Sequence, residues 1–370
     1  MPQQGLIVED VLESLVEQGG SDIHIQAGAP IYFRISGKLT PQPQFGENLE
    51  PEDSQALIFQ MLNNQQRKEL EQNWDLDSAY AVKGLARFRL NVYRERGCWA
   101  ACMRALGSKI PNADKLGVPH ILREMTERPR GMLLITGQTG SGKTTTMAAL
   151  IDLINRTRAE HILTVEQPIE YVFPNIKSLF HQRQKGEDTK SFTNALKGAL
   201  RQDPDVIVVG EMRDLETISL ACSAAETGHL VMGTLHTNSA PTTVTRMLDV
   251  FPPEVKPAMQ AQIGNSLVGI CSQNLIKKIG GGRVCAQEIL VNTAAIGNLI
   301  KEGKYSQIYS MIQTGLKLGM QTMEMALANH YKDGKVTWSD AMLKAVKPDE
   351  LERLIGPNPE LAGAAKAKSR

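Results

Sequence analysis

The first hundred residues combine one helical stripe with several strand-like stretches. Over residues 6–17 the apolar positions recur at helical spacing, and Gly19-Gly20 ends the helix that they predict. Helical periodicity returns over 52–72. Strand-like runs occupy 22–25, 31–35, 79–81, 86–93 and 99–104. We therefore predict a small mixed α+β domain over residues 1–105.

The hydrophobic pattern changes after residues 106–118, a stretch of Gly, Pro, Asn and Asp that we interpret as a linker. Short apolar runs then follow without polar alternation, as expected for strands buried on both faces of a sheet. They span 132–136, 162–165, 206–209 and 230–233, and helical stretches such as 143–156 and 191–201 separate them. This alternation predicts an α/β fold with a parallel sheet in a second domain, over residues 119–355.

The last third of the chain reads as mostly helical from about residue 253. Thr337-Trp338-Ser339-Asp340 is typical of a capping box, and a short helix is predicted over 348–355 with Gly356 at its end. Residues 356–370, rich in Ala, Pro and Lys, are predicted to be a disordered tail.

Composition excludes several classes of function. The 370 residues carry 41 Lys and Arg against 40 Asp and Glu, a net charge of +1, which argues against binding nucleic acid through overall positive charge. No run of 18 apolar residues is free of charge, so we expect no transmembrane segment, and the N-terminus lacks a secretory pattern. The five cysteines form no CxxC pair, which favours a reducing compartment over disulfides or structural zinc.

The strongest chemical signal is a glycine-rich loop between a predicted strand and a predicted helix. It matches G-x-x-x-x-G-K-[ST] at every fixed position and reads Gly137-Gln138-Thr139-Gly140-Ser141-Gly142-Lys143-Thr144. The glycines allow backbone N–H groups to turn toward phosphate oxygens, and the helix N-terminus adds partial positive charge. We expect Lys143 to reach the β- and γ-phosphates, Thr144 to supply a hydroxyl to Mg²⁺, and Thr145 to complete the nucleotide site. ATP and Mg²⁺ are therefore the predicted cofactors.

Acidic residues follow two of the predicted core strands. Glu211 comes after the run 206–209, where a carboxylate beside a phosphate loop holds Mg²⁺ or its water; the alternative is a strand end that carries a glutamate without function. Glu166 ends the run 162–165, and a carboxylate there can orient or deprotonate an attacking water. Glu170 lies farther from the strand end, and we expect it to be structural.

Two histidines flank the last predicted core strand. His229 precedes it and His236 follows it, and two histidines without a third ligand do not predict a zinc site. His236, followed by Thr237 and Asn238, is a candidate sensor of the γ-phosphate. The alternative is an ordinary hydrogen-bonded histidine.

Arginines gather on two predicted strands, at Arg87, Arg89, Arg94, Arg96 and Arg104. Three interpretations fit these residues. Basic and aromatic side chains together can bind single-stranded nucleic acid. Arginine fingers can stabilise charge on a transferred phosphoryl group. A solvated basic edge strand can protect a sheet from aggregation.

Taken together, these stretches resemble the type IV pilus retraction ATPases, the twitching-motility members of the secretion ATPase superfamily. The resemblance covers most of residues 15–330 and is carried by SDIHIQAGAPIYFRISGKL, GQTGSGKTTT, AEHILTVEQPIEYV, SFTNALKGALRQDPDVIVVGEMRDLETI, AAETGHLVMGTLHTNSAPTT and GMQTMEMAL. It implies a PAS-like N-terminal domain, a RecA-like ATPase domain with a helical C-terminal extension, and a hexameric ring.

The resemblance also implies roles for residues that match the family's motifs. Residues 137–144 would form the Walker A loop, Glu211 would be the Walker B acid, and Glu166 would be the general base of the Asp box. His229 and His236 would lie in the His box. Arg89 and Arg104 would be arginine fingers at a site completed across a domain or subunit boundary.

The partners that the resemblance implies are further copies in a homohexamer, a platform protein of the inner membrane and other pilus motor ATPases, with no nucleic acid. The implied location is the cytoplasm, peripheral to the inner membrane at the pilus base.

Two positions depart from the family pattern. The Asp box reads Glu166-Gln167-Pro168 in place of Glu-Asp-Pro, and an amide cannot stay anionic, so turnover slows if that aspartate positions Glu166 or Mg²⁺. Gly297, within the stretch 295–300, stands where retraction ATPases normally carry Arg. A helical glycine costs about 1 kcal/mol against alanine and here also removes a charge.

We therefore expect an ATP-hydrolysing hexameric motor for pilus retraction. Two alternatives stay open. The first is a divergent paralogue that acts as an accessory or regulatory nucleotide-binding subunit. The second is a pilus-assembly or secretion ATPase, although the four-cysteine zinc insert common in those relatives has no counterpart among the five cysteines.

Overall fold

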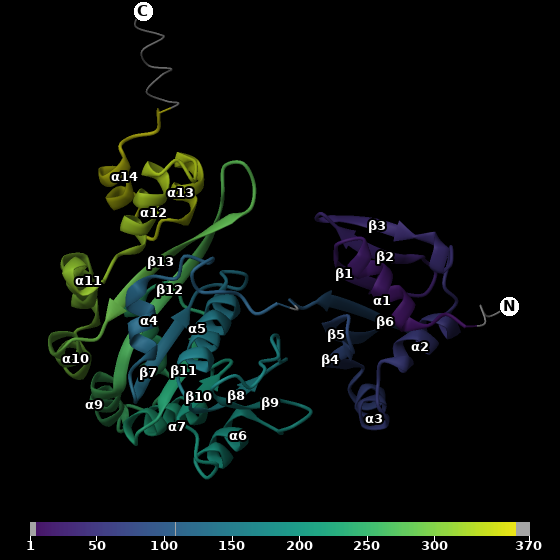
Figure 1. The fold of residues 1–370 in the computed structure, drawn as a ribbon, viewed down its shortest axis with the longest axis horizontal. Helices are drawn as coiled ribbons and strands as arrows, with labels where there is room; N and C mark the ends of the chain where they lie inside the picture. The colour runs from purple at the N-terminus through teal and green to yellow at the C-terminus, as the bar shows by residue number, and fades with distance from the viewer. Residues whose placement is uncertain (1–4, 108, 360–370) are drawn as a thin grey trace, which may run out of the picture. The chain divides into compact units, whose positions relative to one another are not determined.

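The computed structural model describes residues 5–107 and 109–359, and the chain divides into two compact units (Figure 1). Unit 1 comprises Met1–Ile110 together with Pro168–Val172, and unit 2 comprises Pro111–Gln167 and Phe173–Arg370. The first boundary falls within the segment 106–118, whereas no sequence pattern indicated that 168–172 belongs to unit 1. Of the predicted disordered tail, residues 360–370 lie outside the described residues.

Unit 1 is a six-stranded antiparallel sheet with helices on one face. The sheet order is β3-β2-β1-β6-β5-β4. Its elements are α1 (Val8–Glu17), β1 (Gly20–Ile25), β2 (Ile31–Ile35), β3 (Lys38–Gln42), the 3₁₀ turn η1 (Pro43–Phe45), α2 (Pro51–Gln60), α3 (Asn64–Asn73), β4 (Asp75–Val82), β5 (Ala86–Glu95) and β6 (Cys98–Ala105).

Period-two alternation in the strands of unit 1 separates an apolar face from a polar one. Ile23, Phe33, Phe88, Leu90 and Met103 are buried against the helices. The single helical stretch predicted over 52–72 is two helices. A new helix begins at Asn64 because the Asn63 side chain accepts hydrogen bonds from the first amides of α3.

Unit 2 is built on a seven-stranded sheet of order β13-β12-β7-β11-β10-β8-β9. Its strands are β7 (Gly131–Thr136), β8 (His161–Glu166), β9 (Leu179–Gln184), β10 (Val206–Val209), β11 (Leu230–Leu235), β12 (Leu267–Lys277) and β13 (Arg283–Val291). All neighbouring strands are parallel except β12 and β13. The four predicted core strands are confirmed, and they occupy the centre of the sheet.

Helices cover both faces of this sheet, which explains why its central strands lack polar residues. Met132 and Leu134 of β7 belong to one core with residues of α6, α7, α8 and α9. The helices are α4 (His120–Thr126), α5 (Lys143–Thr157), α6 (Phe192–Ala199), α7 (Leu215–Glu226), α8 (Ala240–Asp249), α9 (Lys256–Ser266), α10 (Ala294–Lys301), α11 (Ile308–Thr314), α12 (Met323–Lys332), α13 (Trp338–Lys344) and α14 (Pro348–Ile355), with 3₁₀ turns η2 (Tyr305–Gln307) and η3 (Leu316–Leu318).

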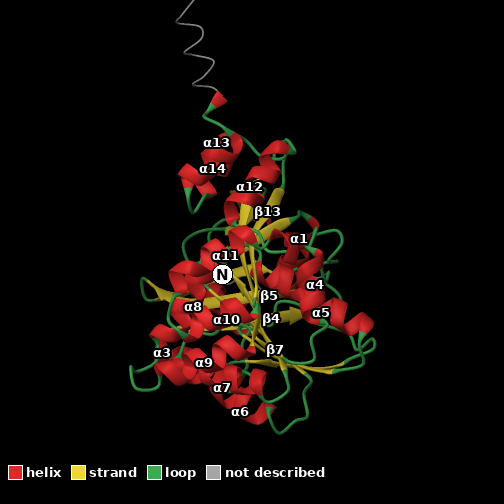
Figure 2. Cartoon of the chain, turned by 90° about the vertical axis from the view of Figure 1, so that its left-hand side faces the viewer, coloured by secondary structure: helices red, strands yellow, loops and turns green. Residues whose placement is uncertain are grey.

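The expectation of a mostly helical chain after about residue 253 is wrong in one respect. Strands β12 and β13 form a long hairpin that completes the sheet next to β7. Polar residues Ser272 and Gln273 interrupt the apolar run of β12, yet both are buried, because Thr136 and Thr146 provide hydrogen-bond partners at 2.8 Å. The C-terminal helices α12, α13 and α14 group beside this hairpin (Figure 2).

Candidate nucleotide-binding site

The carboxyl ends of four neighbouring strands bring most of the predicted site residues to one edge of the sheet. Strands β7, β11, β10 and β8 are adjacent in that order and parallel. They are followed by Gly137, His236, Glu211 and Glu166 or end on them. Ligands of open α/β sheets bind at the carboxyl ends of the strands, so the order of these strands agrees with the predicted nucleotide site.

The phosphate loop is shaped by glycine at its first position. Gly137 has φ 146°, and a Cβ built on it would lie 2.5 Å from the carbonyl oxygen of Gln273. The next three residues, 138–140, are exposed. The hydroxyl of Ser141 is buried and has no hydrogen-bond partner among the described residues. Helix α5 begins at Lys143, directly after the left-handed Gly142, so its N-terminus points at the loop.

Lys143, His236 and Glu211 form a continuous hydrogen-bonded chain. Lys143 Nζ donates to the carbonyl oxygens of Gly137 at 2.8 Å and Gln138 at 3.1 Å, and it lies 3.4 Å from His236 Nδ1. An ammonium group only donates, so Nδ1 accepts and Nε2 carries the proton. Nε2 lies 2.8 Å from Glu211 Oε1, which also pairs with Arg213. The structure therefore brings His236 into direct contact with the lysine of the phosphate loop and with Glu211, and its role as a sensor of the γ-phosphate stays a prediction.

Glu211 is held in place because the residues on either side of it hydrogen-bond to Thr234 of β11. The Thr234 hydroxyl donates to the Gly210 carbonyl at 2.5 Å, and the Met212 amide donates to the Thr234 carbonyl at 3.1 Å. The hydroxyl of Thr144 and the carboxylate of Glu211 are both oxygen donors, the kind of ligand that Mg²⁺ prefers. These residues fit the predicted metal.

Glu166 is half-buried and oriented by two neighbours. Its Oε1 accepts hydrogen bonds from the Thr164 hydroxyl at 2.7 Å and from Gln182 Nε2 at 3.2 Å. Gln182 lies on β9, a strand that the sequence pattern did not reveal. The side chain of Gln167 is exposed. Thr164 and Gln182 therefore both help to orient Glu166.

The structure does not bring His229 to the phosphate loop. It precedes β11, whose first residue, Leu230, pairs with Gly131 at the start of β7. Six strand residues, about 20 Å, separate that edge from the loop. His229 Nδ1 lies 2.9 Å from the Ala224 carbonyl, which only accepts, so the imidazole donates there and ties α7 to β11.

In unit 1, Arg89 and Arg104 are cross-strand neighbours on the polar face of the sheet. The same row continues to Asp22 and Arg34. Arg104 Nε donates to Asp22 at 2.7 Å, and Arg34 lies 3.8 Å from it. Burial opposes ionisation, but hydrogen bonds from Ser21 and Arg104 and the two guanidinium charges outweigh it and lower the pKa of Asp22.

This row corrects one interpretation of the arginines. Strand β5, which carries Arg89, lies between β4 and β6, so it is not an edge strand. Asp22 and Arg34 were not predicted from the sequence as members of this row. Asp22 is next to buried Ile23 on β1, and Arg34 is next to buried Phe33 on β2. In a strand, the side chains of adjacent residues point to opposite faces, so this alternation is the signal that could have placed both residues on the polar face.

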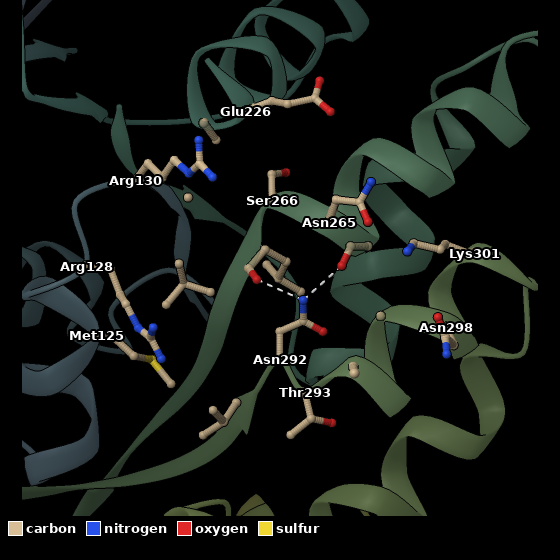
Figure 3. A pocket seen from close by; sticks show the side chains of 18 of the residues that line it. Met125, Arg128, Arg130, Glu226, Asn265, Ser266, Asn292, Thr293, Asn298 and Lys301 are labelled. Atoms are coloured by element: carbon tan, nitrogen blue, oxygen red, sulfur yellow. Dashed lines mark hydrogen bonds between the residues drawn. The ribbon is translucent and has the colours of Figure 1, made fainter. Parts of the chain in front are cut away.

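A hollow of about 600 Å³ lies at the opposite edge of the unit 2 sheet, near Gly131 (Figure 3). Asn292 lies at its centre and donates from Nδ2 to the carbonyl oxygens of Gly264 at 3.0 Å and Leu267 at 2.8 Å. Gly297, the position that departs from the family pattern, lines this hollow.

Gly297 is matched by a second glycine in the neighbouring helix. A Cβ built on Gly297 would lie 2.7 Å from the carbonyl oxygen of Gly264, and a Cβ on Gly264 would lie 2.8 Å from that of Gly297. Every other side chain begins with a Cβ, so an arginine at 297 does not fit unless α9 and α10 move apart. Glycine at position 297 therefore allows α9 and α10 to pack closely, in addition to removing the charge that an arginine would carry.

Over residues 5–107 and 109–359, no helix combines the length and the apolar character needed to cross a bilayer. Within the same residues, no group of three or more His, Cys, Asp and Glu side chains is arranged to hold a metal ion.

Comparison with known proteins places the whole chain in one context. A family model described as type II/IV secretion system protein matches residues 2–303. The "Type IV pilus retractation ATPase PilT" of Pseudomonas aeruginosa is 46% identical over 347 residues, which are 93% of this chain and 99% of that protein. The "Type IV pilus ATPase PilU" of the same organism is 34% identical over 348 residues, 94% of this chain and 91% of that protein. A crystal structure of the pilus retraction motor PilT with bound ADP matches with a TM-score of 0.88 and 48% identity, covering 94% of this chain and 100% of that one.

Proposed function

The chain belongs to the family of type II/IV secretion system proteins, and from that membership we propose that it is an ATP-hydrolysing motor that drives retraction of type IV pili. One observation carries the proposal. A chain that matches a pilus retraction ATPase over 93% of its length also places a phosphate loop, His236 and Glu211 in one hydrogen-bonded chain.

The residues at the strand edge divide the chemistry among them. The amides of 137–144 bind the phosphates, and Lys143 binds the β- and γ-phosphates. Thr144 and Glu211 would hold Mg²⁺, and the bound metal would supply positive charge that neutralises the phosphate oxygens. Glu166, oriented by Thr164, takes the proton of the attacking water. His236 reports the occupancy of the γ-phosphate position to the segment that follows β11.

We also propose a role for the arginines of unit 1. We assign a PAS-like fold to it and a RecA-like fold to unit 2, and we propose a homohexamer in which Arg89 and Arg104 act as arginine fingers across a boundary. Their shared row with Asp22 supports this, because a carboxylate that stays ionised fixes at least Arg104 in one orientation. The proposed ring binds a platform protein at the cytoplasmic face of the inner membrane and cooperates with other pilus motor ATPases.

An accessory or regulatory subunit is the second candidate, and Gln167 is the observation that favours it. Slow turnover despite tight ATP binding would identify that role, whereas robust hydrolysis by the wild-type chain would exclude it. Stoichiometric zinc in the purified protein would instead favour an assembly or secretion ATPase.

The function is tested by deleting the gene and complementing with the wild type, Lys143→Ala or the control Lys335→Ala. The Lys335 side chain is 43% exposed and pairs with Asp333, outside the phosphate site. We expect the deletion and Lys143→Ala strains to be hyperpiliated and immobile and the other two to retract pili. Purified Lys143→Ala protein should have no ATPase activity. Normal retraction or hydrolysis with Lys143→Ala would refute the proposal.

A further inference from the structure

Glu288 is a buried carboxylate that the chemistry described above does not use. It lies on β13 and is 1% exposed. Its register partner on β12 is Ser272, and Ser272 in turn pairs with Thr136, the last residue of β7 before the phosphate loop. The hydroxyls of Ser272 and Thr136 are 2.8 Å apart. Glu288 therefore lies level with the start of the loop, two strands away from it.

The carboxylate of Glu288 binds the first residues of two helices. The Ala240 amide, at the start of α8, donates to Glu288 Oε1 at 2.7 Å. The backbone of Met323, at the start of α12, also hydrogen-bonds to it. Helix N-termini carry partial positive charge, and hydrogen bonds to an ionised acceptor are stronger than neutral ones. Glu288 thus joins α8 to the C-terminal helices.

The start of α8 is also the end of the segment that carries His236. Three residues, 237–239, separate His236 from Ala240. Within them, Thr237 Oγ1 lies 2.6 Å from Thr243 Oγ1, and the Thr243 hydroxyl donates to the Ser239 carbonyl at 2.7 Å. These bonds fasten the segment to the first turn of α8, so a displacement of that turn displaces His236.

We propose that Glu288 is a positioning residue for ATP hydrolysis: by holding the start of α8 against the start of α12, it fixes His236 between Lys143 and Glu211. The inference rests on the proposed function, because it assigns Glu288 a part in turnover.

The surroundings of Glu288 make its charge measurable. Glu324 of α12, Lys347 and Cys271 of β12 are the titratable groups that face it. Burial raises the pKa of Glu288 to about 7; the amides of Ala240 and Met323 and the charge of Lys347 oppose this rise, and Glu324 adds to it. Its carboxyl therefore changes charge within the pH range of an ATPase assay.

The test compares Glu288→Gln with the matched control Glu324→Gln in the full-length protein. Glu324 is equally buried, but it accepts from the amides of Val346 and Lys347 and makes no contact with α8 that the structure records. We expect Glu288→Gln to lower kcat by about tenfold or more, since a charge-assisted hydrogen bond is weakened, while the Kd for ADP changes less than twofold. Glu324→Gln should keep the wild-type kcat.

A pH series supplies a readout that a purely structural role would not move. The ratio of wild-type to Glu288→Gln kcat should fall toward one between pH 8 and pH 6, because the wild-type carboxyl becomes neutral. An unchanged kcat in Glu288→Gln, an equal loss in Glu324→Gln, or a ratio independent of pH would overturn the inference alone. A wild-type protein that binds ATP without hydrolysing it would refute the proposed function as well.

Discussion

Replacing Gly297 by alanine tests whether the two facing glycines of α9 and α10 determine how closely these helices pack. Helix propensity alone favours alanine by about 1 kcal/mol. The new Cβ, however, would lie 2.7 Å from the carbonyl oxygen of Gly264, and Cβ atoms in proteins essentially never come closer than 3.0 Å to another heavy atom of this kind. Relieving an overpacked contact costs about 1–3 kcal/mol. The same carbonyl accepts the hydrogen bond of Asn292, which a shift of α9 weakens by about 1 kcal/mol.

Together these effects give a net loss of about 1–3 kcal/mol for Gly297→Ala. For a unit of this size, that corresponds to a fall in melting temperature of about 2–12 °C. Asn298→Ala is the matched control, because Asn298 is exposed on the same helix and alanine there should leave the melting temperature unchanged or slightly higher. Thermal unfolding followed by circular dichroism measures both. A Gly297→Ala protein that melts at or above the wild-type temperature would refute the close-contact argument.

Four further outcomes are expected. Gln167→Asp should raise kcat for ATP several-fold and Gln167→Asn should not, if the missing carboxylate limits turnover; equal rates in a steady-state assay would show that Gln167 is not limiting. Because the pKa of Asp22 is lowered in the folded state, its ionised carboxylate stabilises the fold above the pKa of the unfolded state, near pH 4. This stabilisation is lost as the pH falls through the pKa of the folded state, so Asp22→Asn should flatten the acid side of a plot of melting temperature against pH. The raised pKa of Glu288 means that the folded state binds more protons than the unfolded state between about pH 4.5 and 7. The free energy of unfolding should therefore fall by roughly 3 kcal/mol as the pH rises through that range in the wild type, and not in Glu288→Gln. Removing Mg²⁺ with EDTA should abolish hydrolysis, and added Mg²⁺ should restore it; activity that persists in EDTA would contradict the assignment of Thr144 and Glu211.

Local patterns were sufficient to predict the centre of unit 2 and the phosphate loop. The strands β7, β8, β10 and β11 are continuous apolar runs, and the spacing of Gly137, Gly142 and Lys143 defines the loop without any tertiary information. Their order in the sheet was not predicted, yet it is the order that places His236 between Lys143 and Glu211.

Long-range contacts explain what the sequence could not reveal. Strand β12 has buried polar residues whose partners, Thr136 and Thr146, lie 136 and 127 residues away. Glu288 belongs to no sequence motif, and its hydrogen bond to Ala240 could not be predicted because Ala240 lies 48 residues before it in the chain. The arginine strand β5 was open to an edge-strand interpretation because pairing with β4 and β6 is a property of the sheet and not of the strand.

The length of β12 has a mechanical consequence. Its eleven residues span about 36 Å, nearly twice the length of six-residue β7 beside it. One part pairs with β7 at the level of Thr136, and the remainder contributes Ile276 to the core under the C-terminal helices. Nine residues of β12 pair with β13, whereas only its first part, up to Ser272, also pairs with β7. A tilt of β12 at the level of Thr136 would therefore be passed along the hairpin to α12, α13 and α14, which pack against its far part.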